Sequence, residues 1–252
     1  MQTLAMVGAS LAGISAARAA RAQGFAGRLV IKGRRHRHRH GGIRPDTAGP
    51  RGPGYVHTLR TLDDAQDLDC QLVPGTRLVI VGAGFIGAEV TSTARALGAE
   101  VTVVCSDTVP LSRPFGREMA ADISALHEIN GVELICDAAI EPYYSGEGVV
   151  SGLRRADGRY LPADVVLVAV GAIPNTEWLA GPGIGLRDGV LCDPMGRTNA
   201  PGVVAVGDCA AWLDEESGKH WRLKHWAGAV SWAPSRRGWV MFTPLTATTS
   251  PT

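Results

Sequence analysis

The chain has 252 residues and a formal net charge of +1, with 45 % hydrophobic and 19 % charged residues. A balance this close to neutral gives no global field that would draw the protein to nucleic acid or to a membrane surface. The longest apolar runs, 78–81 and 165–170, are as long as strands and too short to span a bilayer. The N-terminus leads directly into a glycine-rich turn without a secretory signal, so we expect a cytoplasmic protein.

The first elements predict the start of a β-α-β unit. A strand is expected over Thr3–Val7, a helix over Leu11–Gln23 and a second strand over Arg28–Ile31. Between the first strand and the helix, Gly8-Ala9-Ser10-Leu11-Ala12-Gly13 has the spacing of a dinucleotide-binding turn, with serine at the middle position. The segment 33–54 is rich in Arg, His, Gly and Pro. We interpret it as an irregular solvated loop rather than a metal site, because adjacent cations oppose a divalent ion.

A second glycine turn follows in a stronger context. A helix is expected over Leu59–Leu72, and the strand Thr76–Val81 leads into Gly82-Ala83-Gly84-Phe85-Ile86-Gly87 and the helix Phe85–Leu97. Gly82 permits the tight turn, Gly84 lets a pyrophosphate approach the backbone, and Gly87 permits close contact between helix and strand. The helix amides then face the phosphates. The flanking strand and helix favour dinucleotide binding over a chance glycine-rich turn.

The residue at the end of the next strand selects the cofactor, because an acid there accepts hydrogen bonds from ribose hydroxyls. After the strand Glu100–Val104 the chain has Cys105, with Asp107 two residues later and no arginine directly following. NADH is therefore preferred over NADPH. After the second strand of the first unit the chain reads Lys32-Gly33-Arg34-Arg35, whose cations cannot accept such bonds. Weak nucleotide affinity is expected at the first turn.

The rest of the chain predicts a smaller set of elements. They are a helix over Phe115–Asn130, a strand over Val132–Cys136, a hairpin of Val149–Arg155 with Arg159–Pro162, a buried strand over Asp164–Val170, and a short strand over Gly202–Val206. A helix-like start is expected after Gly207-Asp208, little order beyond Trp212, and a poorly ordered tail over 231–252. The five scattered cysteines predict neither a zinc site nor a redox disulfide and are interpreted as mostly buried filler.

Taken together, these residues resemble the FAD-dependent, NAD(P)H-dependent ferredoxin reductases of the pyridine nucleotide-disulphide oxidoreductase family. The resemblance is carried by 7–13, by 57–65 (His57-Thr58-Leu59-Arg60-Thr61-Leu62-Asp63-Asp64-Ala65), by 78–90, by 161–164 (Leu161-Pro162-Ala163-Asp164), by 171–175 and by 200–210. These segments occur in the order of the family. The absence of a close cysteine pair fits this group better than the disulphide reductases.

The resemblance implies a set of cofactor contacts. Gly8, Ser10 and Gly13 would face the FAD pyrophosphate, and Asp208 would accept a hydrogen bond from the ribityl chain; an ordinary helix N-cap is the alternative for Asp208. Gly82, Gly84 and Gly87 would hold NAD(P)H, with Glu89 near the nicotinamide. Phe85, Ile86, Asp107 and Gly171 are further expected cofactor-binding residues. Hydride would pass to the flavin and electrons onward to a ferredoxin-type iron–sulphur partner. No residue is assigned as acid, base, nucleophile or metal ligand, because the cofactor carries the chemistry.

The predicted fold class is α/β with two Rossmann-like units. A partial, discontinuous FAD-binding domain is expected over 1–32 and 171–230, the irregular loop over 33–54, an NAD(P)-binding domain over 55–170 and the tail over 231–252. The resemblance further implies that most of the FAD domain between Lys32 and Tyr55 and the C-terminal interface domain are missing, as a deletion or a shifted reading frame would produce. Three functions remain open: an active flavin reductase, a remnant that keeps an NAD-binding module without turnover, and a small NAD-dependent sensor.

Overall fold

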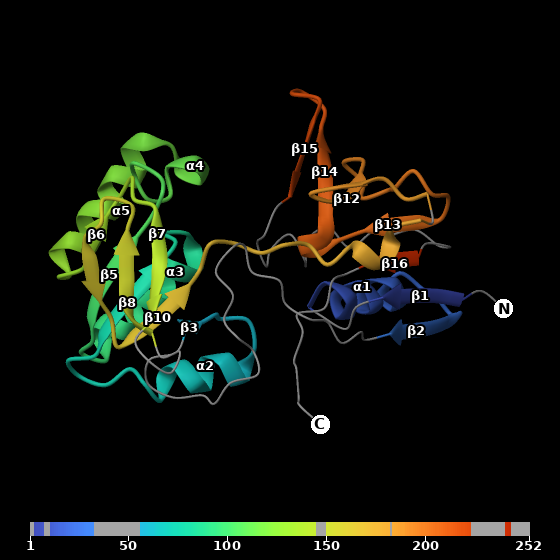
Figure 1. Ribbon diagram of the computed structural model, residues 1–252. Helices are drawn as coiled ribbons and strands as arrows, with labels where there is room; N and C mark the ends of the chain where they lie inside the picture. The colour runs from blue at the N-terminus through green and yellow to red at the C-terminus, as the bar shows by residue number, and fades with distance from the viewer. Residues whose placement is uncertain are drawn as a thin grey trace. The chain divides into compact units, whose positions relative to one another are not determined.

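The computed structural model describes residues 3–7, 11–32, 56–144, 150–181, 183–222 and 240–242. The chain divides into two compact units (Figure 1). The first unit combines Met1–His38 with Ile173–Thr252, and the second unit is Arg39–Ala172. The first unit is therefore discontinuous in sequence, with the second unit inserted into it. The predicted loop over 33–54 lies outside the described residues.

The second unit is built on a parallel sheet with the strand order β3-β10-β4-β5-β6. An antiparallel sheet of β7, β8 and β9 accompanies it. In chain order the elements are β3 (Val56–His57), α2 (Leu62–Asp69), β4 (Arg77–Val81), α3 (Phe85–Ala96), β5 (Glu100–Val104), α4 (Ser112–Phe115), α5 (Arg117–Ile129), β6 (Glu133–Ile135), β7 (Ile140–Tyr144), β8 (Val150–Arg155), β9 (Tyr160–Pro162) and β10 (Val165–Val168).

The continuous apolar sequence of β4 follows from burial on both faces of this sheet. Leu78 and Ile80 pack into a cluster that includes Val90 and Ala94 of α3. Val79 and Val81, which point the opposite way, pack into a second cluster with Val150 and Leu153 of β8. Each fully buried aliphatic side chain contributes about 1.5–3 kcal/mol. The helix on one face and the small antiparallel sheet on the other hold β4 at the centre.

An ion pair joins the starts of β4 and β10. The Arg77 guanidinium donates from Nε to Asp164 Oδ2 at 3.0 Å and from Nη2 to Oδ1 at 2.5 Å. The backbone N–H of Arg77 also donates to Asp164 Oδ2 at 2.9 Å. These hydrogen bonds lower the pKa of the Asp164 carboxyl and raise the pKa of Arg77. The pair lies at the amino edge of the two strands, so it fixes their register at the end opposite the glycine turn.

The first unit contains a parallel sheet with the order β13-β16-β1-β2 and a mixed sheet with the order β11-β12-β14-β15. Its elements are β1 (Thr3–Val7), α1 (Leu11–Ala22), β2 (Arg28–Lys32), the 3-10 turn Glu177–Leu179, β11 (Leu186–Arg187), β12 (Gly189–Cys192), β13 (Val203–Ala205), the 3-10 turn Gly207–Cys209, β14 (Ala210–Asp214), β15 (Lys219–Arg222) and β16 (Val240–Phe242).

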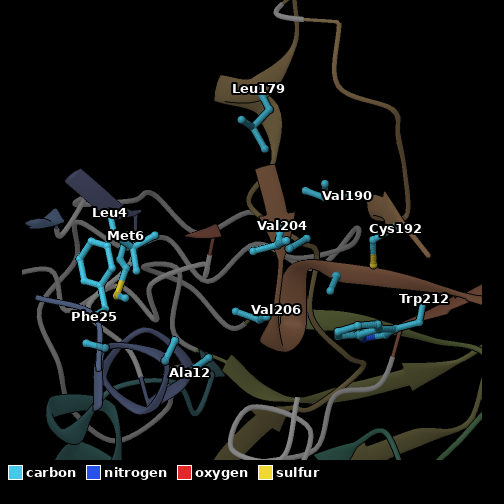
Figure 2. Close-up of a cluster of buried hydrophobic side chains, with 14 residues drawn as sticks. Leu4, Met6, Ala12, Phe25, Leu179, Val190, Cys192, Val204, Val206 and Trp212 are labelled. Atoms are coloured by element: carbon cyan, nitrogen blue, oxygen red, sulfur yellow. The ribbon is translucent and has the colours of Figure 1, made fainter. Parts of the chain in front are cut away.

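One hydrophobic cluster joins the two segments of the first unit. Figure 2 shows Leu4, Met6 and Phe25 grouped together, with Val204, Val206 and Trp212 from the second segment in the same cluster. Met6 and Val204 are fully buried. The small side chains of Ala12 and Ala16 let α1 lie close to this cluster. Residues that are distant in sequence therefore share one core.

The strand β16 lies between β1 and β13 and pairs in parallel with both. The sequence predicted a poorly ordered tail over 231–252, and for 240–242 that prediction is wrong. Its apolar residues are too few to give a periodic signal, and their partners are remote in sequence. The remaining tail residues lie outside the described part of the chain.

Other sequence predictions need correction between Asp208 and Arg222. A 3-10 turn, not a helix, follows Val206, and it leads directly into β14. The expectation of little order beyond Trp212 is wrong for 213–222, because β14 and β15 form an antiparallel hairpin with the register Trp212↔Trp221. The predicted helix over 59–72 is shorter, since α2 begins after its N-cap Thr61, which forms a capping box with Asp64, and ends at Asp69. Among the described residues no helix has the length and apolarity needed to cross a membrane.

The position of β16 predicts a sharp dependence on where the tail is cut. Deletion of 240–252 should leave the facing edges of β1 and β13 unpaired, lowering Tm and promoting aggregation. Deletion of 243–252 alone keeps the strand and should leave both properties unchanged. Thermal melts and size-exclusion chromatography of the two deletions measure this difference. Identical behaviour of the two would contradict a structural role for β16.

The Arg77–Asp164 pair predicts a pH-dependent contribution to stability. Because folding lowers the pKa of Asp164, its contribution is present above the unfolded pKa of about 4 and is lost as pH falls through the folded value. Asp164→Asn should lower Tm by about 1–3 °C at pH 7. That difference from the wild type should shrink below about pH 4. Asp122→Asn on the exposed surface of α5 is the charge-matched control. A constant difference from pH 3 to 7 would rule out the ion pair as the cause.

Candidate functional site

The glycine turn after β4 is confined by the backbone around it. Gly82 has φ +107°, and a Cβ there would lie 2.5 Å from the carbonyl oxygen of Ala169. Its N–H donates to the carbonyl of Val104 at 2.8 Å. The turn thus lies between the carboxyl ends of β10 and β5. Only glycine satisfies both the conformation and the space at this position.

Gly87 brings α3 against this turn. A Cβ on Gly87 would overlap the carbonyl oxygen of Gly82, so the first turn of the helix can approach only because Gly87 has no side chain. The hydroxyl of Thr91 donates to the carbonyl of Gly87 at 2.7 Å within the buried face of the helix. Gly82 and Gly87 therefore set where α3 begins and how closely it lies to the sheet.

Gly84 differs from Gly82 and Gly87, because neither its backbone conformation nor the surrounding protein requires glycine at this position. Its φ of −87° and ψ of −170° are accessible to any residue, and no atom lies within 4 Å of a Cβ built on it. Gly84 is the N-cap of α3 and supplies no side-chain hydrogen bond to the helix. The first-turn N–H groups lack intrahelical partners and form the positive end of the helix dipole. Open space in front of such an end fits an anionic diphosphate.

Exposed apolar side chains flank this helix start. Phe85 and Ile86 are 49 % and 40 % exposed. The ring of Phe85 meets Phe115 edge to face, with 5.6 Å between ring centroids. The sequence predicted Phe115 only as the first residue of a helix over 115–130; it is instead the last residue of α4, and α5 begins at Arg117. The separation of the two rings along the chain left no local signal for their contact.

The other predicted residues of the second unit reach the same edge of the sheet. Asp107 follows β5, and its carbonyl accepts from the N–H of Asp137 at 3.2 Å. Its side chain is half-buried. Gly171 follows β10 with φ +111° and is exposed. Glu89 is exposed on α3, one turn beyond its start. The carboxyl edge of the parallel sheet therefore carries Gly82, Gly84, Asp107 and Gly171.

The first unit brings Asp208 to the start of α1. A Cβ on Gly207, which has φ +71°, would lie 3.0 Å from the Cβ of Ala12. The carbonyl of Asp208 accepts from Nη1 of Arg222 at 3.2 Å. Nη2 of the buried Arg222 pairs with Asp188 at 3.1 Å, so this arginine ties the 3-10 turn to β15 and the β11–β12 corner.

The first glycine turn is described only in part. Gly13 is buried within α1. Gly8 and Ser10 lie outside the described residues. The strand β2 ends at Lys32. This cation stands where a dinucleotide-binding unit would have an acidic residue that accepts hydrogen bonds from the ribose hydroxyls. The described residues of the first unit thus bring the 3-10 turn Gly207–Cys209, which contains Asp208, beside the first turn of α1, and β2 contains no acid.

Comparisons with known proteins identify the family. Residues 40–233 match the family described as pyridine nucleotide-disulphide oxidoreductase. The ferredoxin–NAD(+) reductase component of the biphenyl dioxygenase system from Paraburkholderia xenovorans is 43 % identical over 164 residues, which are 65 % of this chain and 40 % of that protein. Rhodocoxin reductase from Rhodococcus erythropolis is 35 % identical over 160 residues, 64 % of this chain and 37 % of its own length. The chain thus spans about 40 % of the length of the curated relatives it matches.

Solved structures share the fold. The putidaredoxin reductase–putidaredoxin complex aligns with a TM-score of 0.80 at 23 % identity, covering 92 % of this chain and 73 % of that chain. The structure of Fdr9 aligns with a TM-score of 0.77 at 28 % identity, covering 92 % and 72 %. The α/β fold class and the family resemblance predicted from the sequence are confirmed. The chain belongs to the pyridine nucleotide-disulphide oxidoreductase family.

Proposed function

We propose that the second unit binds NAD(H) with its diphosphate at the start of α3. The observation that carries this proposal is the open space at Gly84, between the close backbone approaches at Gly82 and Gly87. The first-turn N–H groups of α3 would donate to the diphosphate oxygens. The side chain of Asp107 would accept from the ribose hydroxyls and repel a 2′-phosphate. NADH is accordingly preferred over NADPH. Glu89 and Gly171 would lie toward the nicotinamide half.

We further propose that the chain acts as an oxidoreductase together with FAD. In the first unit Gly13 and Asp208 would hold the flavin nucleotide near the start of α1, with Gly8 and Ser10 in the preceding turn. Bound FAD would supply the chemistry that takes up hydride from NADH and passes electrons on singly. The protein's own groups orient the two nucleotides, and no side chain of this chain is given a proton-transfer role. Lys32 at the end of β2 offers no acceptor to the ribose, so we expect weak FAD retention.

The proposed electron acceptor is a ferredoxin-type iron–sulphur protein. Several relatives are named as ferredoxin–NAD(+) reductase components of dioxygenase systems. One structural neighbour is a complex of putidaredoxin reductase with putidaredoxin. Because this chain spans less than half of those curated relatives, the partner is inferred from family membership rather than from a surface of this protein.

A second function is supported by the asymmetry between the two units. The second unit keeps the complete glycine turn and Asp107, whereas β2 of the first unit ends in Lys32. An NAD-binding module without flavin turnover would need only the glycine turn and Asp107 of the second unit. The two functions differ in one measurable property, the retention of a flavin that NADH can reduce.

A visible spectrum of the purified chain after addition of FAD and gel filtration distinguishes these functions. We expect little bound flavin and saturable quenching of protein fluorescence by NADH at lower concentrations than by NADPH. Retained flavin that NADH bleaches would support the reductase. A colourless protein that binds NADH would support the binding module, and a folded protein that binds neither nucleotide would contradict both.

Gly84 offers a direct test of the NADH site. Gly84→Ala places a methyl group in the open space, so the Kd for NADH should rise by about tenfold or more, as loss of a hydrogen bond to a charged group would cause. The free energy of unfolding should change by at most about 1 kcal/mol, the usual range for an N-cap substitution. Gly87→Ala is the contrasting variant, whose Cβ overlaps the Gly82 carbonyl and should lower Tm. Unaltered NADH affinity in folded Gly84→Ala would refute this location.

A further inference from the structure

Two cysteines that are distant in sequence are neighbours at the carboxyl edge of the second unit's sheet. Cys105 follows β5 and Cys136 follows β6, each one residue beyond the register pair Val104↔Ile135. The N–H of Cys105 donates to the carbonyl of Ile135 at 2.9 Å, which extends the ladder to this position. Adjacent strands lie about 4.8 Å apart, within the Cα separations that disulfides bridge.

The two thiols have different environments. Cys105 is buried, and its thiol donates a hydrogen bond to the carbonyl of Asp107 at 3.3 Å. Burial and the neighbouring Cys136 raise the pKa of the Cys105 thiol to about 12. Cys136 is half-buried, so a dissolved reagent reaches its sulfur first. The sequence predicted cysteines that are mostly buried; Cys105, Cys192 and Cys209 are buried, whereas Cys136 is half-buried and Cys70 is exposed.

We propose that Cys105 and Cys136 are a redox-active pair that closes to a disulfide across β5 and β6. With a peroxide as oxidant, the Cys136 thiol is converted to a sulfenic acid and one water is released. The sulfur of Cys105 then attacks the Cys136 sulfur, the S–O bond breaks, and a second water leaves. In sum two thiols lose two electrons and two protons to one hydrogen peroxide. A dithiol reductant reverses the change by thiol–disulfide exchange.

Closure of this bond would affect the segment that carries Asp107. The thiol hydrogen bond from Cys105 to the Asp107 carbonyl is lost when its hydrogen is removed. The same segment is tied to the next strand by the bonds from Asp137 N–H to Asp107 and from Ala138 N–H to Cys105. We expect the Kd for NADH to rise about threefold to tenfold on oxidation, comparable to the loss of one hydrogen bond. This consequence rests on the proposed NADH site, whereas the disulfide itself does not.

The test is oxidation of the full chain by dilute hydrogen peroxide, followed by alkylation, digestion and mass spectrometry. We expect a linked peptide pair joining Cys105 to Cys136, two fewer alkylated thiols, and recovery of both by dithiothreitol. Cys70→Ser should behave like the wild type, whereas Cys136→Ser, or Cys136→Ala if the serine variant fails to fold, should form no link. Cys192 and Cys209 are 3 % exposed and should remain reduced. Oxidation without a Cys105–Cys136 link, or no oxidation, would overturn the proposal.

NADH titration of the reduced and oxidised forms separates this proposal from the proposed function. A linked pair in a chain that binds NADH in neither form would leave the disulfide established and refute the NADH site. NADH binding in a chain that forms no Cys105–Cys136 link would support the NADH site and refute the disulfide. Equal NADH affinity in both redox forms would refute the coupling between the pair and the nucleotide site.

Discussion

The close approach of α3 to the turn after β4 is the constraint on which the second unit depends. Gly87 lies so near the Gly82 carbonyl that any side chain would push the helix away. The helix start is thereby held at the carboxyl edge of the sheet, where its unsatisfied N–H groups face open space at Gly84. The close contacts at Gly82 and Gly87 thus hold the positive end of the helix dipole beside the open space at Gly84.

The elements predicted well from the sequence are those whose signal is local. The strand β5 was expected over Glu100–Val104 and is found there, and α3 ends one residue before its expected limit. Their signals are local: valine recurs at 101, 103 and 104 in β5, and α3 starts in the glycine turn and ends just before Gly98. The glycine turn was equally predictable, because its spacing alone encodes the backbone geometry. Its three glycines nevertheless have distinct roles, and only coordinates separate Gly84, with open space, from Gly82 and Gly87, with backbone contacts.

The elements that escaped prediction depend on partners that are remote in the chain. The strand β16 is defined by pairing with β1 and β13 rather than by its own sequence. The hairpin of β14 and β15 ends at Arg222, whose buried guanidinium pairs with Asp188 and donates a hydrogen bond to the Asp208 carbonyl. From the local sequence alone, an arginine at this position would be predicted to lie on the surface. Its burial depends on the partners that the β11–β12 corner and the 3-10 turn supply, and these are distant from β15 in the sequence.

The same reasoning explains why the cysteine pair was invisible to spacing rules. Those rules detect ligands on one short segment, whereas a parallel sheet collects the residues that follow successive strands at one edge. Asp107, Cys105, Cys136 and Gly171 all follow strands of the second unit, and the helix start after β4 lies at that edge too. Nucleotide recognition and thiol chemistry would therefore share a short length of backbone. A change at the Cys105 sulfur would reach the Asp107 segment through the hydrogen bond that this thiol donates to the Asp107 carbonyl.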